Sequence, residues 1–170
     1  MERIMIIGCG GSGKSTLAQK LGTHTGLPVV HLDQIWWQPG SWEHLSREEF
    51  DVQLDAVLNS ERWILDGNFN RTLERRLDFC DTVIYLDYNR FVCIWSWLKR
   101  MVRYWGKSRP DMGPDCPEKF DWAFFTWLWN FNKTNRKNYH ALLKARTNQN
   151  EYIFRNRRQL RKYWNNLTTG

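Results

Sequence analysis

The sequence predicts a three-layer α/β fold with a five-stranded parallel sheet, and three observations support this. Short apolar runs rich in β-branched residues alternate with segments of helical period along the 170 residues. A glycine-rich turn directly follows the first apolar run and precedes a helical segment. No repeat or low-complexity linker interrupts the alternation, so residues 1–170 are expected to form one domain.

The glycine-rich turn fits the phosphate-binding pattern G-x-x-x-x-G-K-[ST] at every fixed position over residues 8–15. Glycines allow a tight turn whose amide N–H groups converge on phosphate oxygens, and the following helix adds its positive end. Lys14 is expected to reach the β- and γ-phosphates of ATP, and Ser15 to ligate Mg²⁺. The predicted ATP-binding residues are Gly8, Gly10, Gly11, Ser12, Gly13, Lys14, Ser15 and Thr16.

The same glycines also satisfy the dinucleotide-binding pattern G-x-G-x-x-G, from Gly8 to Gly13. Asp33 lies 20 residues beyond Gly13, where an acid that binds the ribose would be expected. Lys14 favours ATP over a dinucleotide, because only the phosphate-binding loop needs a lysine at that position.

The first half of the chain continues the alternation. After the first strand, residues 3–7, a helix is expected over residues 15–22 and a second strand over 29–33, which ends in Asp33. Three tryptophans within residues 36–42 flank a Pro-Gly pair without regular period. They would either stack on a planar ligand or cover the edge of the core.

A capping box marks the next helix, because Ser46 is followed three residues later by Glu49. That helix is expected to end near residue 59. Residues 63–65 form a third predicted strand, which delivers Asp66 at its end, and residues 71–79 form a short helix.

The second half carries two long helical segments. A fourth strand is expected over residues 82–87, and residues 91–105 then carry a clear apolar stripe of 3.6-residue period. We interpret the aromatic residues of this stripe as core rather than as ligand contacts. Residues 106–120 contain three prolines and two glycines and are expected to form a surface excursion or lid.

The predicted elements after the lid are a helix from residue 122 to about 145, a fifth strand over 151–154 and a basic helix over 157–166. The net charge is +7, and the basic residues concentrate in the last 40 positions. This distribution suits polyanions, which include nucleotides and nucleic acids, or else marks a solvated face.

The remaining composition predicts a cytoplasmic protein. No apolar run is long enough to span a bilayer, and no secretory leader precedes the first strand. The four cysteines have no C-x-x-C spacing and no paired histidine, so we expect reduced thiols rather than a zinc site.

Residues 63–71, Trp-Ile-Leu-Asp-Gly-Asn-Phe-Asn-Arg, resemble the stretch of adenylate kinase in which a strand ends in Asp-Gly and an arginine follows. The His-Leu-Asp at 31–33, the Asp-Gly-Asn at 66–68 and the Lys-Ser-Arg-Pro-Asp at 107–111 resemble the small adenylate-kinase-related family of DNA topology modulation proteins. The resemblance implies a P-loop NTPase of the nucleoside monophosphate kinase type, with sheet order 2-3-1-4-5 and ATP as donor.

One departure concerns Arg71, which lies five residues after Asp66 rather than the four of adenylate kinase. This spacing weighs against giving Arg71 the phosphate-binding role that the arginine has in that family.

Chemistry suggests roles for the remaining candidates. Asp66 would hold Mg²⁺ through water or act as a turn acid, and Asp33 would orient an acceptor hydroxyl or act as a structural turn acid. One or two of the lid-proximal arginines would close over the transferring phosphate, each alternatively being a solvated surface residue. These arginines are Arg100, Arg103 and Arg109.

Two function classes follow. The first is a small ATP- and Mg²⁺-dependent kinase that phosphorylates a nucleotide or another small acceptor. The alternative is a nucleic-acid-associated ATP-binding protein without that activity, for which the basic C-terminal helix is the sequence support. Because no DNA-reading motif is present, we expect only weak and non-specific binding to nucleic acid.

Overall fold

The computed structural model describes residues 1–38, 43–107, 117, 120–146 and 149–169. Its strands are β1 (Arg3–Gly8), β2 (Val29–His31), β3 (Trp63–Asp66), β4 (Thr82–Leu86) and β5 (Asn150–Phe154). They pair in parallel in the order β2-β3-β1-β4-β5, which confirms the predicted order. The central strands are buried almost throughout, as expected for a parallel sheet that is covered on both faces.

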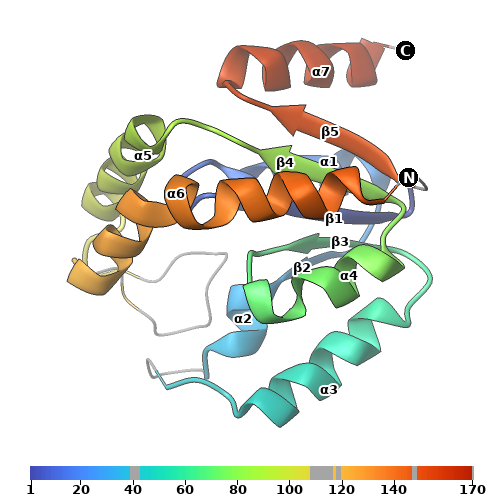
Figure 1. Ribbon diagram of the computed structural model, residues 1–170, viewed down its shortest axis with the longest axis horizontal. Coiled ribbons are helices and arrows are strands. Elements are labelled where there is room, and N and C mark those ends of the chain that lie inside the picture. Colours follow the sequence, from blue (N-terminus) through green and yellow to red (C-terminus); the bar gives the residue numbers. More distant parts are fainter. Residues whose placement is uncertain (39–42, 108–116, 118–119, 147–148, 170) are drawn as a thin grey trace.

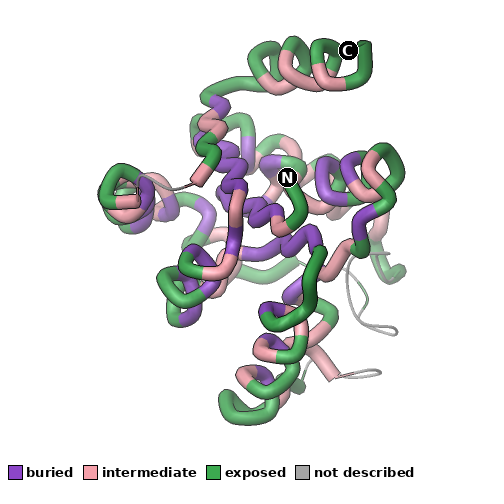
Figure 2. The backbone as a smooth tube through the Cα atoms, turned by 90° about the vertical axis from the view of Figure 1, so that its right-hand side faces the viewer, coloured by how far each residue is buried: buried purple, intermediate pink, exposed green. Residues whose placement is uncertain are grey.

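The helices are α1 (Lys14–Thr25), α2 (Leu32–Trp36), α3 (Arg47–Leu58), α4 (Leu73–Phe79), α5 (Arg90–Arg103), α6 (Trp122–Lys144) and α7 (Arg157–Thr169), with a 3₁₀ turn η1 (Asn70–Thr72) before α4. Figure 1 shows α4 and α6 in front of the sheet and α1 behind it. The purple tube of the buried strands runs through the centre of Figure 2, whereas α7 is green and pink at the edge. The three-layer α/β prediction is therefore confirmed.

Side-chain hydrogen bonds cap the first turns of α3, α5 and α6. Ser46 and Glu49 form the predicted capping box, in which each side chain accepts a backbone N–H at the start of α3. Asn89 caps α5 by accepting the N–H of Phe91, and Asp121 caps α6 in the same way. These caps explain why the helices begin where the sequence patterns indicated.

Two predictions about these elements were wrong. Strand β2 ends at His31, and Asp33 lies inside the short helix α2 rather than at a strand end. The stripe of α5 is only partly core, because Cys93 and Trp97 are buried whereas Phe91 and Trp95 are more than 60% exposed. Helical period identifies an apolar stripe but not the surface that covers it.

The predicted lid lies mostly outside the described residues, since 106, 107, 117 and 120 alone are described between 106 and 120. Arg109, Trp42 and the Pro-Gly pair at 39–40 also lie outside them. None of the described helices combines the length and apolar composition that crossing a bilayer would require.

Candidate active site

The phosphate-binding loop joins the carboxyl end of β1 to the amino end of α1. Gly8, Gly11 and Gly13 have φ values of 146°, 75° and 97°, a region that side-chain-bearing residues rarely adopt. A Cβ atom at Gly10 would lie 2.8 Å from Leu128 Cδ2 of α6. These glycines therefore provide the backbone turn and also leave room for the helix that packs against the loop.

Helix α5 approaches the loop even more closely. A Cβ atom at Gly11 would lie 2.3 Å from the carbonyl oxygen of Cys93. The neighbouring Cys93 thiol, together with burial, raises the pKa of the Cys9 thiol. Cys9 is therefore a protonated thiol that packs the loop against α5, not a reactive nucleophile.

Two side chains of the loop carry polar atoms that suit an anion. Lys14 Nζ donates to the Cys9 carbonyl oxygen at 3.1 Å, which holds the ammonium group over the loop. Ser12 Oγ is buried and has no hydrogen-bond partner within the described residues. A buried hydroxyl without a partner is costly, so the loop presents an unused donor beside its converging amides.

A cavity of about 990 Å³ lies over the loop, and it brings most of the predicted site residues together. Gly10, Gly11, Gly13, Lys14, Ser15, Thr16, Asp33, Asp66, Arg100 and Arg103 all line it. Gly8 and Ser12 belong to the loop, but they are buried and do not line the cavity. Asp33 reaches the cavity from α2, half-buried, although the sequence placed it on a strand.

Asp66 ends β3 beside the loop and belongs to a chain of polar side chains. His31 Nδ1 lies 2.9 Å from Asp66 Oδ2, and His31 Nε2 lies 2.8 Å from Gln19 Nε2. Because the Gln19 amide nitrogen can only donate, His31 Nε2 accepts and His31 Nδ1 donates its proton to Asp66. The other carboxylate oxygen, Asp66 Oδ1, is buried without a hydrogen-bond partner within the described residues.

Asn68 is a residue of the site that the sequence reasoning missed. Its Oδ1 accepts the backbone N–H of Gly8 at 3.0 Å, which ties the loop after β3 to the phosphate-binding loop. Asn68 also lines the cavity. The Asp-Gly-Asn motif was the available signal, but it was used only as a family resemblance.

Aromatic rings form the opposite edge of the cavity. Trp95 and Trp97 of α5 and Phe124 and Trp127 of α6 line it, and Lys99 Nζ lies 5.1 Å from the centre of the Trp95 ring. Trp37, which follows α2, also lines the cavity. The α5 stripe thus supplies rings that line the cavity as well as side chains of the core.

Trp36 packs against the protein core, which is one of the two roles that the sequence left open for the tryptophans before α3. Its ring stacks on His44 at 4.6 Å and meets the rings of Phe50 and Phe69 edge-on. Trp36 therefore covers the edge of the core, whereas Trp37 faces the cavity.

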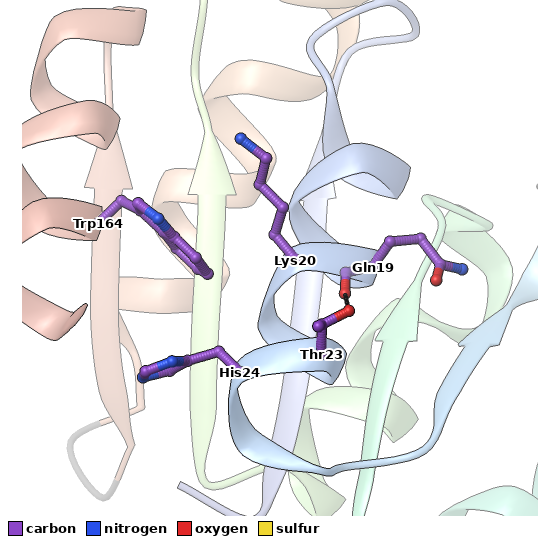
Figure 3. Close-up of a pocket in the computed structure, with 5 residues that line it drawn as sticks. All are labelled: Gln19, Lys20, Thr23, His24 and Trp164. Atoms are coloured by element: carbon purple, nitrogen blue, oxygen red, sulfur yellow. Dashed lines mark hydrogen bonds between the residues drawn. The ribbon is translucent and has the colours of Figure 1, made fainter.

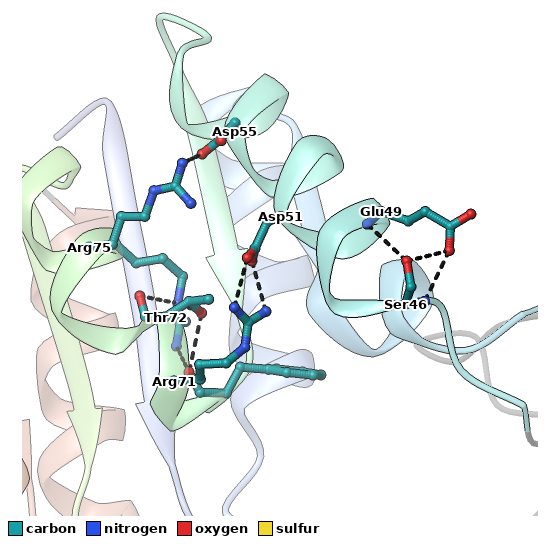
Figure 4. Close-up of polar contacts among 9 residues, drawn as sticks. Ser46, Glu49, Asp51, Asp55, Arg71, Thr72 and Arg75 are labelled. Carbon is teal, nitrogen blue, oxygen red and sulfur yellow. Dashed lines mark hydrogen bonds and ion pairs between the residues drawn. The ribbon is translucent and has the colours of Figure 1, made fainter.

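Arg71 does not line the cavity. Its guanidinium donates two hydrogen bonds to Asp51 of α3, at 2.7 and 2.8 Å, as Figure 4 shows. This pairing lowers the pKa of Asp51. The pairing agrees with the departure from the adenylate kinase spacing.

A smaller hollow of about 510 Å³ lies on the outer side of α1. Gln19, Lys20, Thr23 and His24 of α1 and Trp164 of α7 line it. In Figure 3 His24 points toward the ring of Trp164, whereas the Gln19 side chain points away from it. Because it contains no residue of the phosphate-binding loop, we do not assign it a part in phosphate chemistry.

The residues present fit Mg²⁺ together with a nucleotide. Within the described ranges, no group of three or more His, Cys, Asp or Glu gathers to hold a metal. Mg²⁺ usually binds through one or two protein oxygens together with substrate phosphates. Ser15 and the unpartnered Oδ1 of Asp66 match that donor set.

Comparisons with known proteins agree with this geometry. No family model matches the chain. An adenylate kinase from Clavibacter michiganensis subsp. michiganensis is 28% identical over 111 residues, which cover 64% of this chain and 54% of that protein. The chain thus spans about half the length of the curated relative it matches.

Solved structures share the fold at low sequence identity. Shikimate kinase from Acinetobacter baumannii, in complex with shikimate, has a TM-score of 0.62 and 15% identity, covering 99% of this chain and 91% of that one. Shikimate kinase from Bacteroides thetaiotaomicron has a TM-score of 0.58 and 15% identity, covering 98% and 96%. Deoxyadenosine kinase from M. mycoides has a TM-score of 0.52 and 16% identity, covering 98% and 99%. The chain therefore has the fold of P-loop kinases.

Proposed function

We propose that this protein is an ATP-dependent phosphotransferase that moves the γ-phosphoryl group of ATP to a hydroxyl or phosphate oxygen of a small acceptor. One observation carries the proposal. The phosphate-binding loop, two acids and two arginines from α5 all line one cavity, although they come from separate parts of the chain. Phosphoryl transfer needs such positioning and charge neutralisation more than it needs covalent chemistry.

The donor side is assigned to the loop. The amides of residues 10–14 and the Lys14 ammonium would bind the β- and γ-phosphates. Ser15 and Asp66 would hold Mg²⁺, which supplies charge neutralisation for the phosphate oxygens. His31 orients Asp66 from the other side, through the bond at 2.9 Å.

The acceptor side is assigned to Asp33, at the amino-terminal end of α2. Asp33 would accept the proton of an acceptor hydroxyl and so orient its oxygen toward the γ-phosphorus. The bond from the γ-phosphorus to the bridging oxygen breaks, the bond to the acceptor oxygen forms, and ADP leaves. Arg100 and Arg103 would stabilise the charge on the transferring group, with Arg109 as a further candidate from the sequence.

The test is an acceptor screen that measures ADP release from Mg·ATP. The panel contains nucleoside monophosphates, deoxynucleosides and shikimate, because the related proteins include adenylate kinase, deoxyadenosine kinase and shikimate kinase. We expect one class to raise ADP release well above the acceptor-free rate. No acceptor-dependent release, combined with release that duplex DNA stimulates at physiological salt, would instead favour the nucleic-acid alternative.

A further inference from the structure

Arg76 of α4 is the most deeply buried charged side chain near the cavity, with 0% exposure. Its guanidinium donates to the carbonyl oxygens of three successive residues, Gly67 at 2.9 Å, Asn68, and Phe69 at 3.1 Å. Its Nε donates to the Thr72 carbonyl and hydroxyl oxygens. Within the described ranges, no carboxylate forms an ion pair with it.

Burying an arginine that is paired only with neutral oxygens is unfavourable in free energy. Burial lowers the pKa of Arg76 to about 10, so the side chain stays charged at neutral pH. Taking such a charge out of water costs free energy, which only well-directed hydrogen bonds offset. The planar guanidinium satisfies several carbonyls at once, which the point charge of a lysine cannot do.

The backbone that Arg76 holds is strained. Gly67 has a φ of 143°, and Phe69, with a φ of 32°, is the one non-glycine residue of positive φ in the described part of the chain. Such conformations persist where several contacts with the surrounding structure hold the backbone in place, and they are more frequent at functional sites. The three carbonyl bonds to Arg76 provide that constraint for residues 67–69.

This strained loop is in direct contact with the candidate site. Asp66 precedes it and lines the cavity, and the Asn68 side chain accepts the N–H of Gly8. A displacement of residues 67–69 would therefore alter both the acid assigned to Mg²⁺ and the first residue of the phosphate-binding loop.

We propose that Arg76 is a positioning residue for the nucleotide site. By fixing the carbonyls of residues 67–69, it holds Asn68 against Gly8 and keeps Asp66 at the edge of the cavity, without touching nucleotide itself. The proposal rests on the proposed function for its effect on ATP, whereas its effect on Gly8 is independent of any ligand.

The chain provides a matched control on the same helix. Arg75 is the neighbouring arginine, but its side chain is exposed and pairs with Asp55 of α3, as Figure 4 shows. Arg75→Lys therefore makes the same chemical change as Arg76→Lys without touching residues 67–69. Asn68→Ala keeps the backbone carbonyl that Arg76 binds and removes the side chain that lines the cavity and links to Gly8.

The first measurement is amide hydrogen exchange of Gly8 relative to Ile6, in the protein without nucleotide. Both residues belong to β1, so a loss of global stability raises both rates together, whereas a local displacement raises the ratio. For Arg76→Lys and Asn68→Ala we expect the ratio to rise about tenfold, the equivalent of one lost hydrogen bond. Arg75→Lys should leave the ratio unchanged.

The second measurement is the Kd for Mg·ATP by calorimetry. Arg76→Lys and Asn68→Ala should weaken it by about tenfold, and their double variant should show little further loss because both act through one contact. An unchanged Gly8 ratio in Arg76→Lys overturns the proposal. If Arg76→Lys does not fold, an unchanged ratio in Asn68→Ala overturns it, and a raised ratio supports it.

Failure of the proposed function gives a different result. In that case the wild-type protein does not bind Mg·ATP at all, while the exchange of Gly8 still reports whether Arg76 positions the loop.

Discussion

The two edges of the cavity are built in opposite ways. At the β3 edge, short hydrogen bonds join buried polar groups, from Gln19 through His31 to Asp66 and from Asn68 to Gly8. At the α5–α6 edge, Trp95 lies 61% exposed and carries Lys99 over its ring. Under the proposed function, the β3 edge would therefore be preorganised to position phosphates, whereas the α5–α6 edge offers ring surface and charge that a bound ligand would cover.

The largest effect is expected at Lys14, which lines the cavity from the phosphate-binding loop. Lys14→Ala should weaken Mg·ATP binding by roughly 100-fold or more, since charge-assisted hydrogen bonds to phosphate are lost. The fold should remain intact, because the one hydrogen bond that the Lys14 side chain makes to the loop is accepted by the Cys9 carbonyl oxygen. Calorimetry measures the affinity, and Lys162→Ala on α7 serves as the control of equal charge change. Equal affinity in wild type and Lys14→Ala would refute the phosphate-binding assignment.

Substituting the two acids tests the β3 edge and the acceptor side of the site separately. Asp66→Asn should raise the Mg²⁺ concentration that half-saturates turnover by about tenfold, since a metal ligand loses its charge. Asp33→Asn should lower turnover at nearly normal ATP affinity, because it only orients the acceptor. Mg²⁺ titrations of the two variants and the wild type decide this, and coincident curves for Asp66→Asn and wild type would contradict the assignment.

A smaller effect is expected from the aromatic edge. Trp95→Ala should raise the KM of one substrate by roughly threefold to tenfold, the usual range for a lost ring contact. Trp122→Ala is the matched control, because Trp122 is 69% exposed yet does not line the cavity. Steady-state kinetics with both substrates varied would measure it, and equal KM changes in the two variants would mean that Trp95 is surface only.

The smallest effect is expected at Arg71, which contributes to neither edge. Arg71→Gln should lower the free energy of unfolding by less than about 1 kcal/mol, as for most exposed ion pairs. The KM for any phosphorylated acceptor should not change. Urea unfolding and kinetics measure the two quantities, and a large rise in that KM would restore the phosphate-binding role to Arg71.

Local patterns predicted most of the fold, and tertiary contacts account for what they missed. The glycine-rich turn between β1 and α1 and the capping box at Ser46 depend on residues close in sequence, and the structure confirms both as elements of the fold. The bond between Asn68 and Gly8 joins residues 60 positions apart, and the Asp-Gly-Asn motif marks Asn68 without indicating its partner. Arg76 is similar, because its burial depends on how α4 packs and its sequence context resembles that of exposed Arg75.

Asp33 shows the limit of periodicity. Helix α2 has five residues, too few for a helical period to be distinguished from the end of a strand. Asp33 lines the same cavity as the glycine-rich loop, but it belongs to a helix rather than to the end of a strand. For α5, the pattern identified the helix correctly but could not tell which rings face α6 and which face the cavity.

The contact between Cys9 and Cys93 offers a way to measure how often α5 separates from the phosphate-binding loop. Both thiols are buried, and the pKa of Cys9 is raised by the neighbouring Cys93 thiol and by burial. An alkylating reagent needs an accessible thiolate, so it can modify Cys9 only while α5 is separated from the phosphate-binding loop. The rate at which iodoacetamide modifies Cys9 thus measures how often this part of the molecule opens, and a ligand that spans both edges of the cavity should slow it.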